Sequence, residues 1–134
     1  MSRREHSATE LFRKLGGSSS NEALIDTVIG ELQKEGLQSD ERFTEAFVHN
    51  RIERGYGPLR IHQELRQKGI SDALIRDYVD ANDPDWQQRA SRARNKRFGH
   101  QLPTNYKEKA KQSRFLQQRG FSGEQIRRVI EEDE

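Results

Sequence analysis

The side chains best suited to chemistry in this sequence are cations that recur at helical spacing. Three of them lie three and four residues apart, on one face of a predicted helix: Arg89, Arg92 and Lys96. A neighbouring residue and the next predicted helix add further cations: Arg97, Lys107, Lys109, Lys111 and Arg114. Long cationic side chains contact phosphate oxygens, and each neutralised phosphate releases counterions, so such binding weakens as salt rises. The pattern predicts a surface that binds a polyanion.

The charge of the chain is strongly segregated, although its net value is only +2. Residues 1–86 hold 12 basic and 16 acidic residues, whereas residues 87–130 hold 12 basic and two acidic ones, and the last four residues are all acidic. The basic block, with a net charge of +10, favours nucleic acid or an acidic protein surface as the partner. A solvated surface without a partner is the alternative, but an excess of one sign is less typical of it.

Catalysis and metal binding find little support in the sequence. The four histidines lie far apart and lack metal-ligand spacing, and we expect His49 and His62 on the surface. Asp83 and Asp85 resemble paired catalytic carboxylates, but a helix cap and a first-turn charge beside Pro84 explain them more simply. The chain has no phosphate loop and no cysteine, which excludes a thiol nucleophile and cysteine-ligated zinc. We expect a binding protein without cofactor or metal, not an enzyme.

The composition favours small helical units over one large core. Of the 134 residues, 31% are apolar and 34% charged, and the mean hydropathy is −1.12. The apolar residues nevertheless recur at helical spacing, which argues against general disorder. No apolar run approaches the ~20 residues of a membrane span, and no signal-peptide core follows Met1. We therefore expect a cytoplasmic protein without a membrane contact, and a monomer.

Glycine, proline and capping residues divide the chain into helices. A helix from Asp40 ends near Gly55-Tyr56-Gly57-Pro58, because the two glycines suit positive φ and the proline suits the first turn of a new helix. The new helix ends at Gly69, and Ser71 begins the next one. The other predicted helix starts are Ser7 with Glu10 as a capping box, Asn21, Ser39 or Asp40, Asp83 with Pro84 at the first position, Thr104 or Asn105, and Ser122.

Apolar residues at helical spacing predict which side of each helix is buried. The candidates are Leu24, Ile25, Val28, Ile29 and Leu32 in one helix and Phe43, Ala46, Phe47 and Ile52 in the next. Trp86, Ala90, Ala93 and Phe98 follow a helix that is otherwise rich in arginine, Arg94 included. Tyr106 is suited to stacking on an exposed base, whereas Trp86, Phe98 and Phe115 are better suited to a core.

An internal repeat relates the second and third parts of the chain. Residues 65–71, LRQKGIS, match residues 116–122, LQQRGFS, at a constant offset of 51 residues. The match continues at the same offset, because Ile75 corresponds to Ile126 and Val79 to Ile130. A weaker copy, with Leu11, Ile25 and Ile29, precedes them. Self-similarity of this length predicts stacked supersecondary units.

These motifs resemble the RecX family of bacterial regulatory proteins. The resemblance rests on Arg4-Glu5-His6-Ser7, Glu10-Leu11, Asp40-Glu41-Arg42-Phe43, Gly55-Tyr56-Gly57-Pro58, Arg60-Ile61, Glu64-Leu65, Lys68-Gly69-Ile70, Trp86, Lys96-Arg97-Phe98-Gly99, Arg114-Phe115-Leu116 and Arg119-Gly120-Phe121. It implies an all-α fold of tandem three-helix repeats in an elongated, curved array. The expected repeats are residues 1–37, 38–82 and 83–134, the last with an acidic tail. The first is expected to be incomplete, because the family has a further helix ahead of Glu5.

The same resemblance implies a function in recombination. RecX proteins bind in the groove of the filament that the RecA recombinase forms on DNA, where they suppress ATP hydrolysis and strand exchange and limit filament growth. Direct binding to single- and double-stranded DNA is expected as well. The candidate contact surface spans repeats two and three and adds these cations to the eight above: Arg51, Arg54, Arg60, Arg66, Lys68 and Arg119. A helical nucleic-acid-binding protein without a recombinase partner is the alternative.

Overall fold

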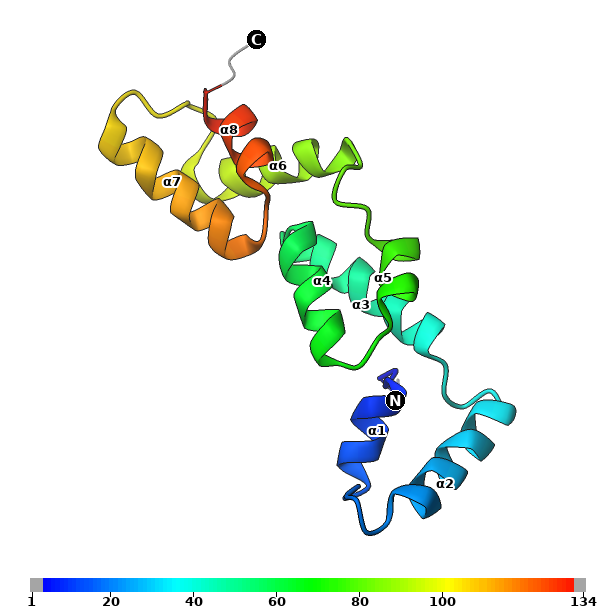
Figure 1. The fold of residues 1–134 in the computed structure, drawn as a ribbon. Helices are drawn as coiled ribbons and strands as arrows, with labels where there is room; N and C mark the ends of the chain where they lie inside the picture. The colour runs from blue at the N-terminus through cyan, green and yellow to red at the C-terminus, as the bar shows by residue number, and fades with distance from the viewer. Residues whose placement is uncertain (1–3, 132–134) are drawn as a thin grey trace. The chain divides into compact units, whose positions relative to one another are not determined.

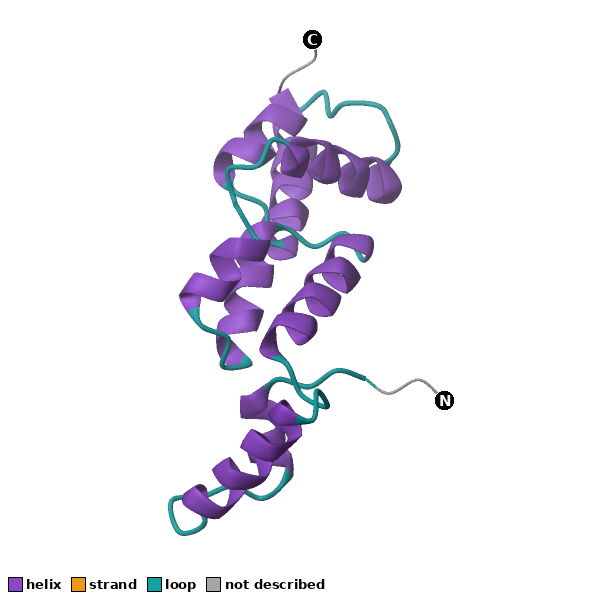
Figure 2. Ribbon diagram, turned by 90° about the vertical axis from the view of Figure 1, so that its right-hand side faces the viewer, coloured by secondary structure: helices purple, strands orange, loops and turns teal. Residues whose placement is uncertain are grey.

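The computed structural model describes residues 4–131, and within that range the chain is helical and contains no strand (Figures 1 and 2). Its helices are α1 (Ala8–Lys14), α2 (Glu22–Lys34), α3 (Asp40–Glu53), α4 (Pro58–Gln67), α5 (Asp72–Tyr78), α6 (Asp85–Phe98), α7 (Tyr106–Arg119) and α8 (Gly123–Glu131). The predicted all-α class is confirmed. The end of the predicted acidic tail, residues 132–134, lies outside the described range.

Tertiary contacts divide the chain into two compact units. The N-terminal unit comprises residues up to 48 together with residues 64–78, and the C-terminal unit comprises residues 49–63 and those from 79 onward. The division falls within α3 and within α4, so each of these helices contributes to both units. The units are defined by tertiary contacts, whereas the three repeats are defined by sequence similarity. The limits of the repeats therefore stay a prediction.

The buried apolar side chains of the N-terminal unit come from the segment between the start of α2 and the end of α5. They are Ile25, Ile29, Phe43, Phe47, Val48, Leu65, Ile70 and Ile75. On α2, however, Leu24 is 69% exposed and Val28 is 42% exposed, although the sequence pattern places both on the apolar side. The helix that packs on α2 is α1, which has only seven residues and covers a narrow strip.

The buried side of α3 also differs from the prediction. Ala46 is exposed and Ile52 is only half-buried, whereas Thr44 is fully buried. The Thr44 hydroxyl donates a hydrogen bond of 2.7 Å to the Asp40 carbonyl one turn earlier. That bond satisfies the buried hydroxyl, so Thr44 can occupy a core position although threonine is a polar residue.

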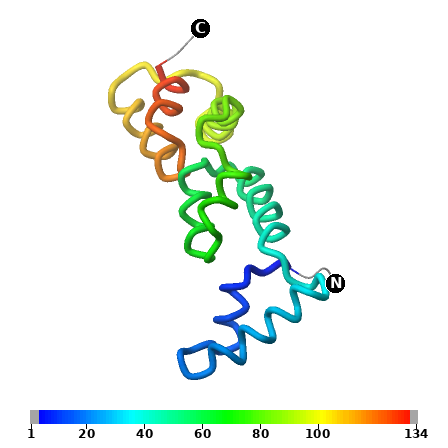
Figure 3. The backbone as a smooth tube through the Cα atoms, turned by 45° about the vertical axis from the view of Figure 1, so that its right-hand side comes forward, coloured from blue at the N-terminus to red at the C-terminus, as the bar shows by residue number. Residues whose placement is uncertain are grey.

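In the C-terminal unit, α6, α7 and α8 pack against one another (Figure 3). The buried apolar side chains are Ile61, Val79, Trp86, Ala90, Leu116, Phe121, Ile126, Val129 and Ile130. The indole Nε1 of Trp86 donates to the Asp80 carbonyl at 2.8 Å, and the Gln125 amide donates to the Ala81 carbonyl at 3.0 Å. These bonds fix the segment that leads into α6 against the core.

Most helix starts agree with the predicted caps. The Ser7 hydroxyl accepts from the Glu10 N–H at 3.1 Å, and the Ser7 N–H donates to the Glu10 carboxylate at 3.2 Å, which completes the predicted capping box. Side-chain oxygens of four more predicted caps accept a backbone N–H: Ser39, Ser71, Asn105 and Ser122. Local chemistry therefore determines where these helices begin.

Two cap predictions are wrong in detail. Asn21 makes no capping hydrogen bond, because its side chain accepts the Ser18 N–H at 2.7 Å and so closes the preceding loop. Pro84 is not the first residue of α6, which begins at Asp85, one position later. Asp83 is therefore not the N-cap itself, which is Pro84, but its carboxylate accepts the Asp85 N–H at 2.9 Å and closes the turn before α6.

The predicted repeat is visible in the turns that end α4 and α7. Gly69 has φ +81° and Gly120 has φ +100°, both in the left-handed region. The N–H of the apolar residue after each glycine donates to a carbonyl five residues earlier, at 3.1 Å after Gly69 and 3.2 Å after Gly120. Both turns are therefore Schellman motifs, which favour glycine at this position.

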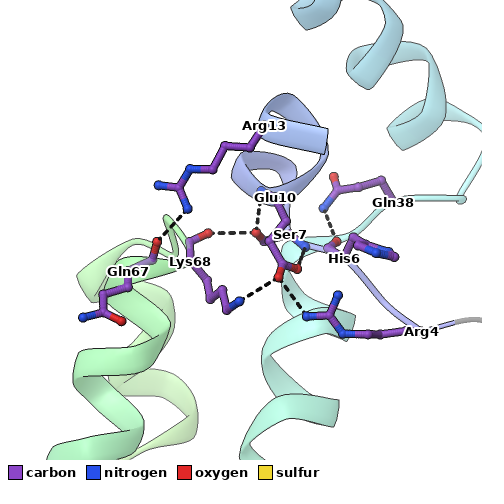
Figure 4. Close-up of polar contacts among 8 residues, drawn as sticks. All are labelled: Arg4, His6, Ser7, Glu10, Arg13, Gln38, Gln67 and Lys68. Atoms are coloured by element: carbon purple, nitrogen blue, oxygen red, sulfur yellow. Dashed lines mark hydrogen bonds and ion pairs between the residues drawn. The ribbon is translucent and has the colours of Figure 1, made fainter. Parts of the chain in front are cut away.

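In the N-terminal unit, α1 and its N-terminal cap cover the turn after α4 (Figure 4). The Ser7 hydroxyl donates to the Lys68 carbonyl at 2.8 Å, and the Arg13 guanidinium donates to the Gln67 carbonyl at 3.3 Å. Carbonyls in the last turn of a helix have no partner within the helix. Residues of α1 and its cap thus satisfy carbonyls at the end of α4.

In the C-terminal unit, the start of α4 covers the turn after α7 in the same way. The Gly57 N–H donates to the Arg119 carbonyl at 2.6 Å, and the Arg60 guanidinium donates to the Gln118 carbonyl at 3.1 Å. Gln118 and Arg119 are the residues that lie 51 positions after Gln67 and Lys68. Both units therefore contain one type of joint, made with different donors.

Candidate nucleic-acid interface

Many of the predicted cations border a cavity in the C-terminal unit, which we call the basic groove. Its volume is about 350 Å³, and its walls are the end of α3 with the following turn, one side of α6 and the last part of α7. Six predicted cations line it: Arg54, Arg89, Arg92, Lys96, Arg97 and Arg119. The remaining lining residues are Ile52, Glu53, Gly55, Ala93 and Phe115. The cations thus converge from three segments far apart in sequence.

The groove is strongly cationic because its arginines and lysine lack acidic partners. None of the six forms an ion pair with a carboxylate within residues 4–131, and Glu53 is the one acidic residue in the lining. Like charges this close repel one another, and a bound anion relieves that repulsion. The groove is therefore suited to a phosphate-rich ligand.

Arg119 joins two walls of the groove. From α7 its guanidinium donates to the Arg54 carbonyl at 3.0 Å, and it lies 4.9 Å from the centroid of the Tyr56 ring. The Arg60 guanidinium lies 4.3 Å and that of Arg51 6.0 Å from the same ring. Cation–π contacts of this kind stabilise by roughly 0.5–2 kcal/mol each. Arg51 and Arg60 therefore support the edge of the groove without lining it.

At Gly57, the backbone at the start of α4 packs closely against the backbone of the turn after α7. A Cβ atom at this position would lie 2.5 Å from the Gly120 carbonyl carbon. The prediction that both Gly55 and Gly57 adopt positive φ is correct only for Gly55, at +84°. Gly57 is required because no side chain fits between the start of α4 and the turn after α7.

Except for Arg119, the predicted cations of α7 lie outside the groove. Lys107, Lys111 and Arg114 are exposed, and their spacing of four and three residues places them on one side of the helix, whereas Lys109 is half-buried. Tyr106 at the start of α7 is 86% exposed, so its ring is free to stack on a ligand as predicted. This row is a second, separate cationic strip.

Two predicted contact residues, Arg66 and Lys68, belong to the N-terminal unit and have acidic partners. Arg66 lies 3.5 Å from the Asp72 carboxylate, and Lys68 lies 2.9 Å from that of Glu10 (Figure 4). Burial by itself would raise the pKa of Glu10, but hydrogen bonds from Lys68, Arg4 and the Ser7 backbone outweigh it and hold the pKa at about 2. Lys68 thus has a structural role in the joint between α1 and α4.

The joint should therefore weaken in acid. Because the pKa of Glu10 is lower in the folded state than its usual 4.5, the stabilisation is complete above that value and disappears as pH falls toward 2. We expect Glu10→Gln to lose on the order of 2 kcal/mol of unfolding free energy at neutral pH, after allowance for solvent screening. Urea unfolding of both proteins at several pH values tests this. Equal curves at pH 7 would contradict it.

Arg94, one of the arginines that make α6 basic, is only 2% exposed. Its guanidinium donates to the Gln101 carbonyl at 2.9 Å, to the Gly99 carbonyl at 3.0 Å, to the Gln112 amide oxygen at 3.2 Å and to the Asn95 amide oxygen. Burial lowers the pKa of Arg94. The missed signal is its spacing, because Arg94 continues the buried series of Trp86 and Ala90 at four-residue intervals.

Lysine cannot replace this fork of donors. We expect Arg94→Lys to lower the free energy of unfolding by about 2 kcal/mol or more, because one ammonium cannot reach acceptors on both sides of the α6–α7 loop. Arg92→Lys, on the exposed side of the same helix, is the matched control and should change stability by less than about 0.5 kcal/mol. Thermal unfolding followed by circular dichroism compares them. Similar melting temperatures would show that Arg94 is not a structural support.

The histidines show no sign of a metal site in the described range. His49 is exposed as predicted, while His62 is half-buried. Within residues 4–131, no cluster of three or more His, Cys, Asp or Glu side chains is arranged to hold a metal ion. No helix in that range has the length and apolar character needed to cross a membrane.

Tandem helical units of this kind define a helical-repeat protein. Two family models match this chain: the second three-helix domain of RecX over residues 39–78 and the third over residues 83–130. Regulatory protein RecX of Halorhodospira halophila is 41% identical over 127 residues, which are 95% of this chain and 79% of that protein. Regulatory protein RecX of Legionella pneumophila is 42% identical, and the match covers 98% of this chain and 88% of that protein. The chain belongs to the RecX family.

A solved structure supports the fold. The crystal structure of RecX from Lactobacillus salivarius superposes with a TM-score of 0.74 and covers 96% of this chain and 85% of that one. The two sequences are 24% identical, so this likeness concerns the fold alone. The predicted tandem three-helix organisation is confirmed by it and by the family models.

Proposed function

We propose that this protein regulates the RecA recombinase by binding the RecA–DNA filament and inhibiting its ATP hydrolysis, strand exchange and growth. Family membership supports the choice of partner, as the sequence resemblance implied. The observation that carries the proposal is the basic groove, in which six cations converge on one cavity and none has a carboxylate partner among residues 4–131. Such a protein acts in the cytoplasm as a monomer, on filaments of single- and double-stranded DNA.

The proposed contact surface has two parts. The six groove cations contact phosphates of the nucleic acid, and the α7 strip of Lys107, Lys111 and Arg114 extends the contact. Arg66 and Lys68 contribute less, because their charges are already partly satisfied by Asp72 and Glu10. Catalysis has no part in this function, which is binding and steric control.

The deciding experiment is single-strand-dependent ATP hydrolysis by RecA, titrated with this protein. Inhibition at well below one molecule per RecA supports regulation of the filament and indicates that growth is blocked. Inhibition that begins only when DNA is saturated would instead favour the second candidate, a helical nucleic-acid-binding protein without a recombinase partner. No inhibition at any ratio by the folded protein would contradict the proposal.

A further inference from the structure

The basic groove is a cavity with walls, not a flat patch, and this limits what can enter it. Its volume of about 350 Å³ lies at the small end of the roughly 300–1,000 Å³ range of ligand sites. That is room for one nucleotide unit and not for several. All its walls belong to the C-terminal unit.

The groove offers an aromatic surface as well as charge. The ring of Phe115 is half-buried and lines the cavity, and the guanidinium groups of Arg119 and Arg97 lie 5.1 Å and 5.9 Å from its centroid. Nucleobases stack on aromatic rings and on arginine planes, whereas phosphates are held by arginine and lysine. The lining therefore combines the two surfaces that a nucleotide needs.

A path for the rest of a strand leads out of the groove. Arg92 and Lys96 border it and also border a second, shallower depression on the other side of α6, together with Gln88, Ser91 and Asn95. These side chains carry polar hydrogen-bonding groups. A backbone that crosses α6 between Arg92 and Lys96 would thus remain on polar and cationic surface.

We propose that the basic groove binds one nucleotide unit of a single nucleic-acid strand, with its base turned in against Phe115 and its phosphate held by Arg92 and Lys96. This rests on the proposed function, because it concerns the same groove, and adds selectivity to it. A duplex keeps its bases stacked inside and presents only its outer phosphates, so it can contact the rim of the groove but not its interior. The interior of the groove then distinguishes single strands from duplexes.

Filling the groove without changing its charge tests this inference. Ala93 lines the cavity from α6 and is half-buried, so Ala93→Met places apolar atoms where the base would lie. We expect about tenfold weaker binding of an oligothymidylate of about eight nucleotides, because stacking of a base is lost. Binding of a duplex of equal length stays unchanged. Ala46→Met, at an exposed position of α3, is the matched control and should alter neither affinity.

Fluorescence anisotropy with labelled oligonucleotides gives both affinities, and circular dichroism confirms folding of each variant. Unchanged binding of both ligands by the Ala93→Met variant, or equal losses, would overturn the inference while the proposed function stands. A wild-type protein that binds neither ligand and leaves RecA ATP hydrolysis unaffected would contradict both. The same titration with an oligouridylate shows whether DNA or RNA is the preferred strand.

Discussion

Replacing Arg92, Lys96 and Arg97 together by alanine should reduce the affinity for single-stranded DNA by about 100-fold at low salt. Three exposed phosphate contacts at about 1 kcal/mol each give this loss. Because about 0.7 counterions are released per neutralised phosphate of a single strand, the salt dependence of the logarithm of the binding constant should become shallower by about 2. Anisotropy titrations at several salt concentrations measure both effects.

A matched control separates the groove from net charge. Lys14, Lys34 and Arg76 are exposed on helices of the N-terminal unit, and their triple replacement by alanine removes the same charge. We expect this variant to keep its affinity within about threefold, because none of these three residues lines the groove. If both triple variants lose affinity equally, or if the groove variant keeps its salt dependence, the groove is not the binding surface.

The second large effect concerns stability. Gly57→Ala should destabilise the C-terminal unit by about 3 kcal/mol or more, because its Cβ would overlap backbone atoms of Gly120 and Phe121 that cannot move independently. The hydrogen bond of 2.6 Å from the Gly57 N–H to the Arg119 carbonyl would be strained as well. Trp86, the one tryptophan of the chain, is buried in this unit and reports its unfolding in urea.

Gly30→Ala is the natural control for this substitution. Gly30 lies in the interior of α2, and a Cβ there would meet no atom within 4 Å. The same exchange should therefore stabilise the protein by roughly 0.5–1 kcal/mol, through the higher helix propensity of alanine. A Gly57→Ala variant as stable as the wild type would show that the start of α4 is not held against the turn after α7.

The sequence predicted best what local chemistry determines. Helix ends at Gly69 and Gly120 and the capping box at Ser7 follow from interactions within a few residues, and all are confirmed. The repeat was also predictable, because its turn requires glycine, an apolar residue and serine in order. Membership in the family follows from the same segments, which bear the most specific motifs.

Long-range relations were harder to predict. The cations of α6 were identified, but nothing in their spacing indicates that Arg54 and Arg119 complete a groove with them, because that depends on tertiary packing. The burial of Arg94 was not predicted, because arginine is rarely buried. Gly57 was predicted to have positive φ, but glycine is required there because a side chain would overlap the backbone of Gly120. That contact joins residues far apart in the chain, so neighbouring residues give no sign of it.

The turn that follows α4 meets the start of α1, and the equivalent turn after α7 meets the start of α4. In each joint, carbonyls at corresponding positions are the acceptors, and they accept whatever donor the incoming helix supplies. A module of this kind therefore has hydrogen-bond acceptors in the turn at one end and hydrogen-bond donors in a helix at the other. Gene duplication can therefore lengthen such a protein by whole modules without inventing a new interface, and each added module brings its own chance to acquire a binding surface.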